Sequence, residues 1–173
     1  MSASILVAYA TRYGSTQEVA QTIVEILQKE GFKVDLVPAR KVNSLDGYMA
    51  VVLGAPLYMF RWHNDARHFL SQHRIALTTI PIPIAVFALG PFHDKEEELQ
   101  SARTQLDKEL LKYPWLEPAS IEVFAGKFDP GSLRFPYSLI GPLKKMPASD
   151  ERNWVAIQSW ASSLASLLQV EKG

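Results

Sequence analysis

Short apolar runs that are almost free of polar residues recur along this chain, and they restrict its fold more than any other feature of the sequence. Three of them end directly before a glycine, and the first ends in a turn rich in hydroxyl groups: Ser4–Ala10, Met49–Leu53, Ile82–Leu89 and Ile121–Ala125. A shorter candidate strand, Lys33–Val37, follows Gly31, which we expect to end the preceding helix. Because these runs lack polar alternation, they indicate strands buried on both faces of a parallel sheet.

The segments between these runs carry apolar residues at helical spacing. They define an early, a middle and a final helix: Val19, Ile23, Ile26 and Leu27; Leu99, Ala102, Leu106 and Leu110; Trp154, Ile157, Ala161, Leu164 and Leu168. Polar residues predict the helix starts, with a capping box of Ser15 and Glu18, and with Asn64 and Asp94 as further caps. Five strand–helix units in a row predict a doubly wound α/β sheet.

The turn between the first strand and the first helix, T-R-Y-G-S-T at residues 11–16, has the features of a phosphate-binding turn. It directs backbone N–H groups and the positive end of a helix dipole to one point, where Thr11, Ser15 and Thr16 add hydroxyl donors. No Gly-Lys-Ser/Thr follows, and Gly14 alone cannot form the G-x-G-x-x-G fingerprint of a dinucleotide site. The remaining ligand is a single phosphate monoester, and an ordinary strand-to-helix turn is the alternative.

Glycines at strand ends indicate a ligand at the same edge of the sheet. Ligands of open α/β sheets lie outside the carboxyl ends of the strands, at the switch point of strand order. We therefore expect Gly54 and Gly90 to face one crevice together with residues 11–16. Glycine would allow a positive φ and a close approach of the backbone to a flat ligand there.

Composition excludes several classes of function. The 173 residues are 47% hydrophobic, which is enough for one sizeable core, and 18 basic residues balance 18 acidic ones, which argues against nucleic acid as a partner. The lack of cysteine excludes disulfides, thiolate zinc sites and cysteine nucleophiles. No apolar run reaches the ~18 residues of a membrane span, and no signal pattern is present, so we expect a cytoplasmic protein.

Local patterns assign no metal site and no catalytic side chain. His63, His68 and His73 are spaced by five residues, so they do not share a helical face, and we interpret them as surface or helix-end residues. No Ser/His/Asp set can be identified, and the catalytic residues stay unknown.

Several motifs together resemble the flavodoxin-like FMN-binding family, in the branch that contains menaquinone-dependent protoporphyrinogen oxidase and related flavodoxin-domain proteins. The matching motifs, in chain order, are T-R-Y-G-S-T at 11–16, G-A-P-L-Y at 54–58 followed by His63, F-A-L-G-P-F-H-D at 87–94, F-A-G-K-F-D at 124–129, and the helix start at Asp150…Trp154. The G-P-x-x-D form of the third motif departs from the oxidase itself. The resemblance implies a three-layer sandwich with a five-stranded parallel sheet of order 2-1-3-4-5. It covers a single domain, 1–173, with an inserted segment at about 127–148.

The resemblance also implies the FMN-binding residues. The phosphate would be bound by Thr11, Arg12, Tyr13, Gly14, Ser15 and Thr16. One side of the isoalloxazine would be lined by Pro56, Leu57, Tyr58 and Met59, and the other side by Leu89, Gly90, Pro91, Phe92 and His93. Tyr58 is the aromatic residue best placed to stack, and Trp62 competes with it.

Three classes of function are compatible with such a fold. The first is an FMN-dependent oxidoreductase that oxidises a porphyrinogen-like or other apolar substrate with a quinone as acceptor. The second is a flavodoxin-type electron carrier, against which the zero net charge argues because such carriers are typically acidic. The third is a phospho-acceptor receiver, which needs a carboxylate cluster at the strand ends to hold Mg²⁺. This sequence has no such cluster there, which argues against that class. Positive charge from Arg12, Arg61 and His63, with Asp94 the nearest carboxylate, would raise the flavin potential.

The segment between the fifth strand and the final helix, residues 127–148, is unusually long for a connection. Four prolines at 130, 136, 142 and 147 exclude one long helix, and its many apolar residues argue against disorder. Basic residues beside the apolar ones suit an anionic membrane surface or an apolar, acidic partner. The segment is thus predicted to act either as a lid or as a docking surface for a quinone, a porphyrin-like substrate or a membrane.

Overall fold

Five parallel strands form the centre of the fold. The computed structural model describes residues 4–58, 61–79, 82–132, 139, 141–145 and 147–172. Its parallel strands are β1 (Ser4–Tyr9), β2 (Lys33–Pro38), β3 (Tyr48–Tyr58), β5 (Ile84–Leu89) and β6 (Ser120–Phe124). They lie in the order β2-β1-β3-β5-β6, which is the predicted order 2-1-3-4-5. A sixth strand, β4 (Arg61–Trp62), pairs antiparallel with the end of β3.

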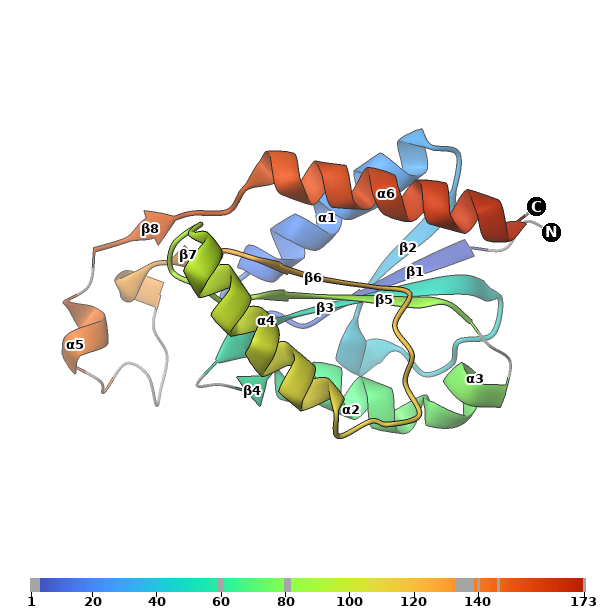
Figure 1. Cartoon of the computed structure of the whole chain (residues 1–173), viewed down its shortest axis with the longest axis horizontal. Coiled ribbons are helices and arrows are strands. Elements are labelled where there is room, and N and C mark those ends of the chain that lie inside the picture. The colour runs from blue at the N-terminus through green and yellow to red at the C-terminus, as the bar shows by residue number, and fades with distance from the viewer. Residues whose placement is uncertain are drawn as a thin grey trace.

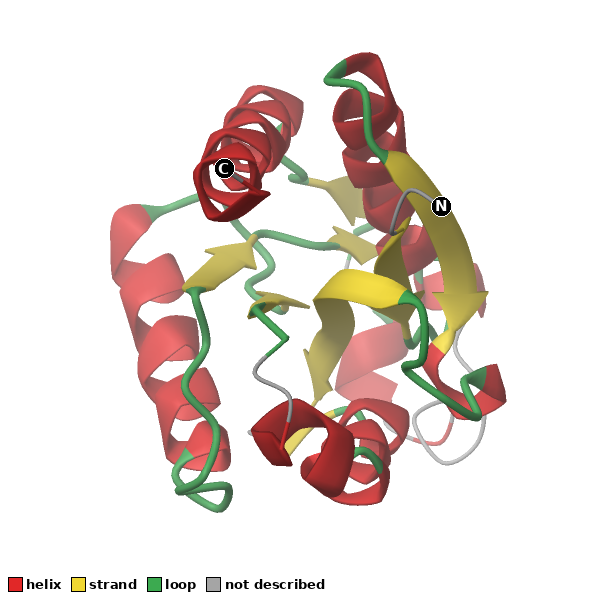
Figure 2. Ribbon diagram, turned by 90° about the vertical axis from the view of Figure 1, so that its right-hand side faces the viewer, coloured by secondary structure: helices red, strands yellow, loops and turns green. Residues whose placement is uncertain are grey.

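Helices cover both faces of this sheet (Figure 1). One face carries α1 (Ser15–Lys29) and α6 (Trp154–Lys172), and the other carries α2 (Asn64–Gln72), α3 (Arg74–Thr79) and α4 (Glu96–Leu110). Figure 2, viewed from the end at which both termini lie, shows the sheet between these layers. In the part of the chain that the structure describes, no helix is both long and apolar enough to cross a bilayer. The three-layer architecture predicted from the sequence is confirmed.

The apolar runs are explained by two cores, one on each face of the sheet. Successive side chains of a strand point to opposite faces, and in β1 Ile5 and Val7 pack with α1 and α6, whereas Leu6 and Ala8 pack on the side of α2 and α4. Both sets are fully buried. A strand that is covered on both sides has no position for a polar residue, which is why polar alternation is missing.

The strands end together at one edge of the sheet, here called the carboxyl edge. In register, Tyr9 of β1 lies beside Gly54, Pro56 lies beside Leu89, and Leu89 lies beside Phe124. The chain leaves each of these strands at this edge, on the left in Figure 1. The three loops that the sequence analysis assigns to a ligand therefore start from the same end of the sheet.

Several short elements complete the fold. Strands β7 (Lys127–Phe128) and β8 (Ser149–Asp150) form an antiparallel pair, and η1 (Ala39–Lys41), η2 (Pro130–Ser132) and α5 (Gly141–Lys144) are single turns. The paired β7 and β8 fix the two ends of the segment 127–148 next to the carboxyl edge (Figure 1). Residues 133–138, 140 and 146 of this segment lie outside the described residues.

The expectation for Gly54 is wrong. Strand β3 continues to Tyr58, so Gly54 lies inside the strand and not at its end. A Cβ atom on Gly54 would lie only 1.9 Å from Cζ of Phe87 on the neighbouring strand. The glycine makes room for this buried ring, which is a packing role.

The predicted helix caps are each displaced by one residue. The N-cap of α1 is Gly14 and not Ser15, that of α2 is His63 and not Asn64, and that of α4 is Lys95 and not Asp94. At α2 the ring supplies the cap, because His63 Nδ1 accepts a hydrogen bond from the Asp65 N–H at 3.0 Å. At α1 and α4 the N-cap residue makes no side-chain cap bond.

Candidate functional site

The turn after β1 is held in shape by its own residues. Thr11 Oγ1 accepts a hydrogen bond from the Gly14 N–H at 2.8 Å. Gly14 has a φ of 93°, in the left-handed region that favours glycine. Helix α1 begins at the next residue with no side-chain cap, so nothing from the cap residue competes for the N–H groups of its first turn.

Thr16 is the residue of this turn that best indicates a ligand. It lies in the first turn of α1, its side chain is 0% exposed, and its Oγ1 has no hydrogen-bond partner. Buried polar groups are nearly always paired, and an unpaired one costs about 1–3 kcal/mol. A buried hydroxyl without a partner, at the positive end of a helix dipole, fits a phosphate group that accepts its hydrogen bond.

The turn itself carries a basic residue, Arg12. The charge of Arg12 helps to lower the pKa of His63, although burial of the His63 ring is the larger cause. The lowered pKa disfavours the charged form of His63, which reduces its share of the positive charge expected from Arg12, Arg61 and His63. Arg61 is exposed on β4, and Asp94 accepts a hydrogen bond from Asn153 Nδ2 at 2.9 Å.

The second predicted loop meets the first through two aromatic rings. Tyr13 and Tyr58 lie edge to face, with centroids 6.3 Å apart and an interplanar angle of 81°. Pro56 and Leu57 are buried residues of β3 and reach the edge of the sheet just before Tyr58. Met59 was predicted to line the flavin, and it lies outside the described residues.

Trp62 is not available as a stacking residue. Its side chain is completely buried, and its Nε1–H donates to the Ala55 carbonyl at 3.0 Å. It belongs to the core on the side of α2 and α4. Among the described residues of this loop, Tyr58 is the aromatic residue that stays partly exposed.

The third predicted loop lies against the second. A Cβ atom on Gly90 would lie 3.2 Å from Leu57 Cβ, which is a tight contact, so the glycine favours the close approach of this loop to Leu57. The Gly90 N–H donates to Phe124 O at 3.2 Å, which ties the loop to β6. Leu89 is buried at the end of β5, and the buried Pro91 accepts from the Gly126 N–H at 2.9 Å.

Phe92 and His93, the last two predicted site residues, lie at the surface. The Phe92 ring is 41% exposed and packs edge to face on Phe128 of β7, with centroids 5.4 Å apart. His93 contacts Glu98 twice: its Nδ1 lies 2.9 Å from Oε1, and its backbone N–H donates to Oε2 at 3.0 Å. The side-chain bond with His93 is the main cause that lowers the pKa of Glu98.

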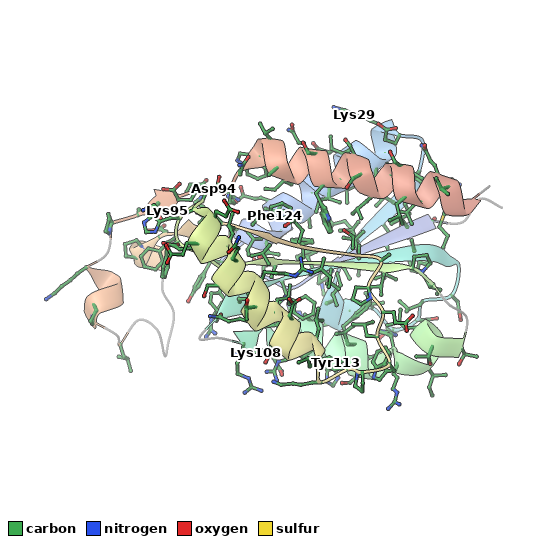
Figure 3. The ribbon with its side chains drawn as sticks, viewed as in Figure 1. Lys29, Asp94, Lys95, Lys108, Tyr113 and Phe124 are labelled. Atoms are coloured by element: carbon green, nitrogen blue, oxygen red, sulfur yellow. The ribbon has the colours of Figure 1, made fainter. Side chains whose placement is uncertain are left out.

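Sequence reasoning missed Arg152 and Asn153, which precede α6. The Arg152 side chain is only 3% exposed and pairs with Asp150 and Glu18. Asn153 caps α6 through Oδ1, which accepts from the Ala156 N–H at 3.0 Å. Figure 3 shows Asp94, the partner of Asn153, at the start of α4. In the sequence, the acidic residues just before Arg152 were the only signal that could have indicated its ion pairs.

The histidines do not form a metal site. His63 caps α2, and His68 is exposed on the same helix. His73 ends α2 as predicted but is buried, with Nε2 3.2 Å from Val42 O and its ring against Phe69. Across the described residues, no group of three or more metal-ligating side chains comes together.

Comparisons with known proteins agree with this architecture. A family model described as a flavodoxin domain matches residues 6–140. Protoporphyrinogen IX dehydrogenase [quinone] from Escherichia coli K12 is 23% identical over 133 residues, which are 76% of this chain and 70% of that protein.

Two solved structures show the same fold. Oxidised flavodoxin 2 from Bacillus cereus aligns with a TM-score of 0.52 at 23% identity, over 71% of this chain and 86% of that one. The C101S mutant of flavodoxin from Pseudomonas aeruginosa aligns with a TM-score of 0.61 at 14% identity, over 96% and 99%. Because the family model spans well over half of the residues, the chain belongs to the flavodoxin domain family, and FMN is the cofactor that this membership implies.

Proposed function

We propose that this chain is an FMN-dependent oxidoreductase that holds the cofactor phosphate on residues 11–16 and the isoalloxazine between residues 56–59 and 89–93. One observation carries the phosphate assignment, namely the buried Thr16 Oγ1 without a partner in the first turn of α1. Membership of the flavodoxin domain family supports the identity of the cofactor.

The residues of the turn have separate roles in this proposal. Thr11 fixes the turn through its bond with the Gly14 N–H, which leaves the next N–H groups of α1 for the phosphate. Thr16 donates its hydroxyl hydrogen to a phosphate oxygen. The helix dipole and the Arg12 guanidinium add positive potential, which favours a dianion over a neutral ligand.

The ring-binding residues act mainly by shape. Tyr58 presents an aromatic ring, and its edge-to-face contact with Tyr13 fixes the orientation of that ring. Gly90 lets the third loop approach Leu57, and the buried Pro56 and Leu89 contribute backbone groups. Bound FMN would supply the two-electron redox chemistry, in which one hydrogen of the reduced substrate leaves as a hydride and the other leaves as a proton to solvent.

We further propose that the substrate is porphyrinogen-like or otherwise apolar and that a quinone is the acceptor. The name of the Escherichia coli relative supports this class, as do two exposed apolar side chains, Phe92 and the 72% exposed Leu139. The segment 127–148 would be an insertion that docks the apolar molecule within a single domain. A peripheral membrane contact of this segment stays a prediction.

Deletion of residues 130–146 tests the docking role. It leaves Asp129, Pro147 and Ala148 as a three-residue connection between Phe128 and Ser149, which already pair in β7 and β8, so the hairpin can close. We expect a folded, FMN-bound protein that has lost turnover with a menaquinone analogue but still reduces a small water-soluble acceptor. Normal quinone turnover would contradict the docking role, and a chain that carries electrons between proteins but oxidises no porphyrinogen would favour the electron carrier.

A point-mutant pair repeats the test without a deletion. Leu139→Ser removes an exposed apolar side chain from the proposed docking segment. Ile75→Ser is the matched control, because Ile75 is 78% exposed on α3, far from the carboxyl edge (Figure 1). The first change should raise the KM for the quinone and the second should not. Equal effects would contradict the proposed location.

A further inference from the structure

Arg152 is a buried cation that the cofactor assignment does not use. Its guanidinium forms a bidentate pair with Asp150, Nε to Oδ1 at 2.9 Å and Nη2 to Oδ2 at 2.7 Å. It also lies over the Trp154 ring, 4.7 Å from the centroid. The pair with Asp150 is the main cause that raises the pKa of Arg152 above its ordinary value, so the charge is permanent.

The remaining nitrogen of Arg152 reaches the first turn of α1. Nη1 donates to the Ser15 carbonyl at 3.3 Å and lies 3.3 Å from Glu18 Oε2. Ser15 directly precedes Thr16, whose buried hydroxyl lacks a partner. Arg152 lies 137 positions after Ser15 in the sequence. Its side chain therefore connects β8 with the helix start that carries the unpaired Thr16 hydroxyl.

The charges around this helix start would not favour an anion without Arg152. Glu18 lies in the first turn of α1, and Asp150 lies beside it through the shared guanidinium. Two carboxylates without a cation would repel a phosphate dianion at the same helix end. With Arg152 in place, one of the two negative charges is cancelled and the Ser15 peptide is held by a hydrogen bond.

We propose that Arg152 is a positioning residue for the phosphate of the bound ligand. It offsets one of the two negative charges of Glu18 and Asp150 and holds the Ser15 peptide, so that the first-turn N–H groups and the Thr16 hydroxyl meet the phosphate in a fixed geometry. This inference rests on the proposed FMN function. Arg152 supports the binding of the phosphate monoester alone, and the flavin ring is not involved.

The dissociation constant of riboflavin divided by that of FMN tests this role, because the two ligands differ only in the phosphate. Arg152→Gln should lower the ratio at least tenfold, about 1.4 kcal/mol, with little change for riboflavin. Glu18→Gln should raise the ratio about two- to fivefold, since it removes a repelling charge that is partly exposed and screened. Arg152→Lys keeps the charge without the bidentate geometry and should lie between wild type and Arg152→Gln.

Arg103→Gln is the matched control. Arg103 pairs with Asp107 at 2.9 Å and donates to the Ile121 carbonyl at 3.2 Å on the opposite face of the sheet from α1, so its loss should leave the ratio unchanged. A purely structural role for Arg152 predicts equal losses for both ligands and no rise for Glu18→Gln, and either result overturns the inference. If Arg152→Gln does not fold, Glu18→Gln and Arg152→Lys decide the question. A wild type that does not prefer FMN to riboflavin would instead refute the proposed function itself.

Discussion

Replacing Thr16 with valine should make the ligand-free protein more stable and its FMN complex weaker. The two side chains have nearly the same shape, so the change leaves no cavity and removes only the hydroxyl. That hydroxyl is fully buried without a partner in the free protein, and in the proposed complex it bonds a charged phosphate. A single substitution therefore has effects of opposite sign on folding and on binding.

The magnitudes follow from the burial of this oxygen. An unsatisfied buried polar group costs about 1–3 kcal/mol, so Thr16→Val should raise the free energy of unfolding of the ligand-free protein by up to that amount. For a chain of this size each kcal/mol corresponds to roughly 2–4 °C in Tm. A hydrogen bond to a charged group contributes about 1.5–3 kcal/mol, so FMN should bind about 10- to 150-fold more weakly.

Urea denaturation of the ligand-free protein and fluorescence titration with FMN measure the two effects. Thr22→Val is the matched control on the same helix, because the Thr22 hydroxyl already bonds the Glu18 carbonyl at 3.3 Å. The control should not stabilise the protein or weaken FMN binding. If Thr16→Val destabilises the free protein, or binds FMN as tightly as wild type, the assignment of Thr16 to the phosphate is refuted.

Three further predictions concern stability. Gly14→Ala should cost about 1–2 kcal/mol through its positive φ, and unchanged thermal unfolding would contradict this. Gly54→Ala should cost about 1–3 kcal/mol because its Cβ meets the Phe87 ring, and Phe87→Leu in the same chain should recover part of the loss in urea denaturation, whereas strict additivity would speak against the contact. Burial lowers the pKa of His73 from 6.5, so the unfolded chain takes up the proton first and the free energy of unfolding should fall as the pH drops below that value. His73→Gln should reduce this fall, and an unchanged pH profile would show that His73 does not cause it.

The parts of the fold that depend on local pattern could be predicted from the sequence. Gly31 follows the end of α1 with a φ of 93°, and the bonds from Gly31 N–H to Gln28 O and from Phe32 N–H to Leu27 O complete a regular helix end. The strand runs were likewise predictable, because burial on both faces leaves a continuous apolar signal, whereas the strand order was implied by the resemblance to the flavodoxin-like family.

The errors concern residues whose role depends on distant partners. Gly54 follows an apolar run and comes two residues before Pro56, a pattern typical of a strand end, yet Phe87 on the next strand requires the glycine inside β3. Trp62 lies in an aromatic loop sequence, but pairing of β4 with β3 carries it into the core. Arg152 contacts residues at the other end of the chain, which no local pattern reports.

The predicted ligand-binding residues could be located only in part. Tyr13 and Tyr58 come together, and Gly90 lies against Leu57, as three loops at one edge would require. The two-residue strands β7 and β8 are too short to show a periodicity, so the way in which segment 127–148 is attached was not predictable.

Titration of the ligand-free wild-type protein with FMN and, separately, with riboflavin tests the central claim most directly. The two ligands share the flavin ring, so the difference in their affinities reports the phosphate site on α1. We expect one FMN per chain and at least about tenfold weaker binding of riboflavin, because riboflavin lacks the charged group that the Thr16 hydroxyl and the first-turn N–H groups would bind. Equal affinities, or no flavin binding at all, would contradict the claim that this turn holds the phosphate of FMN.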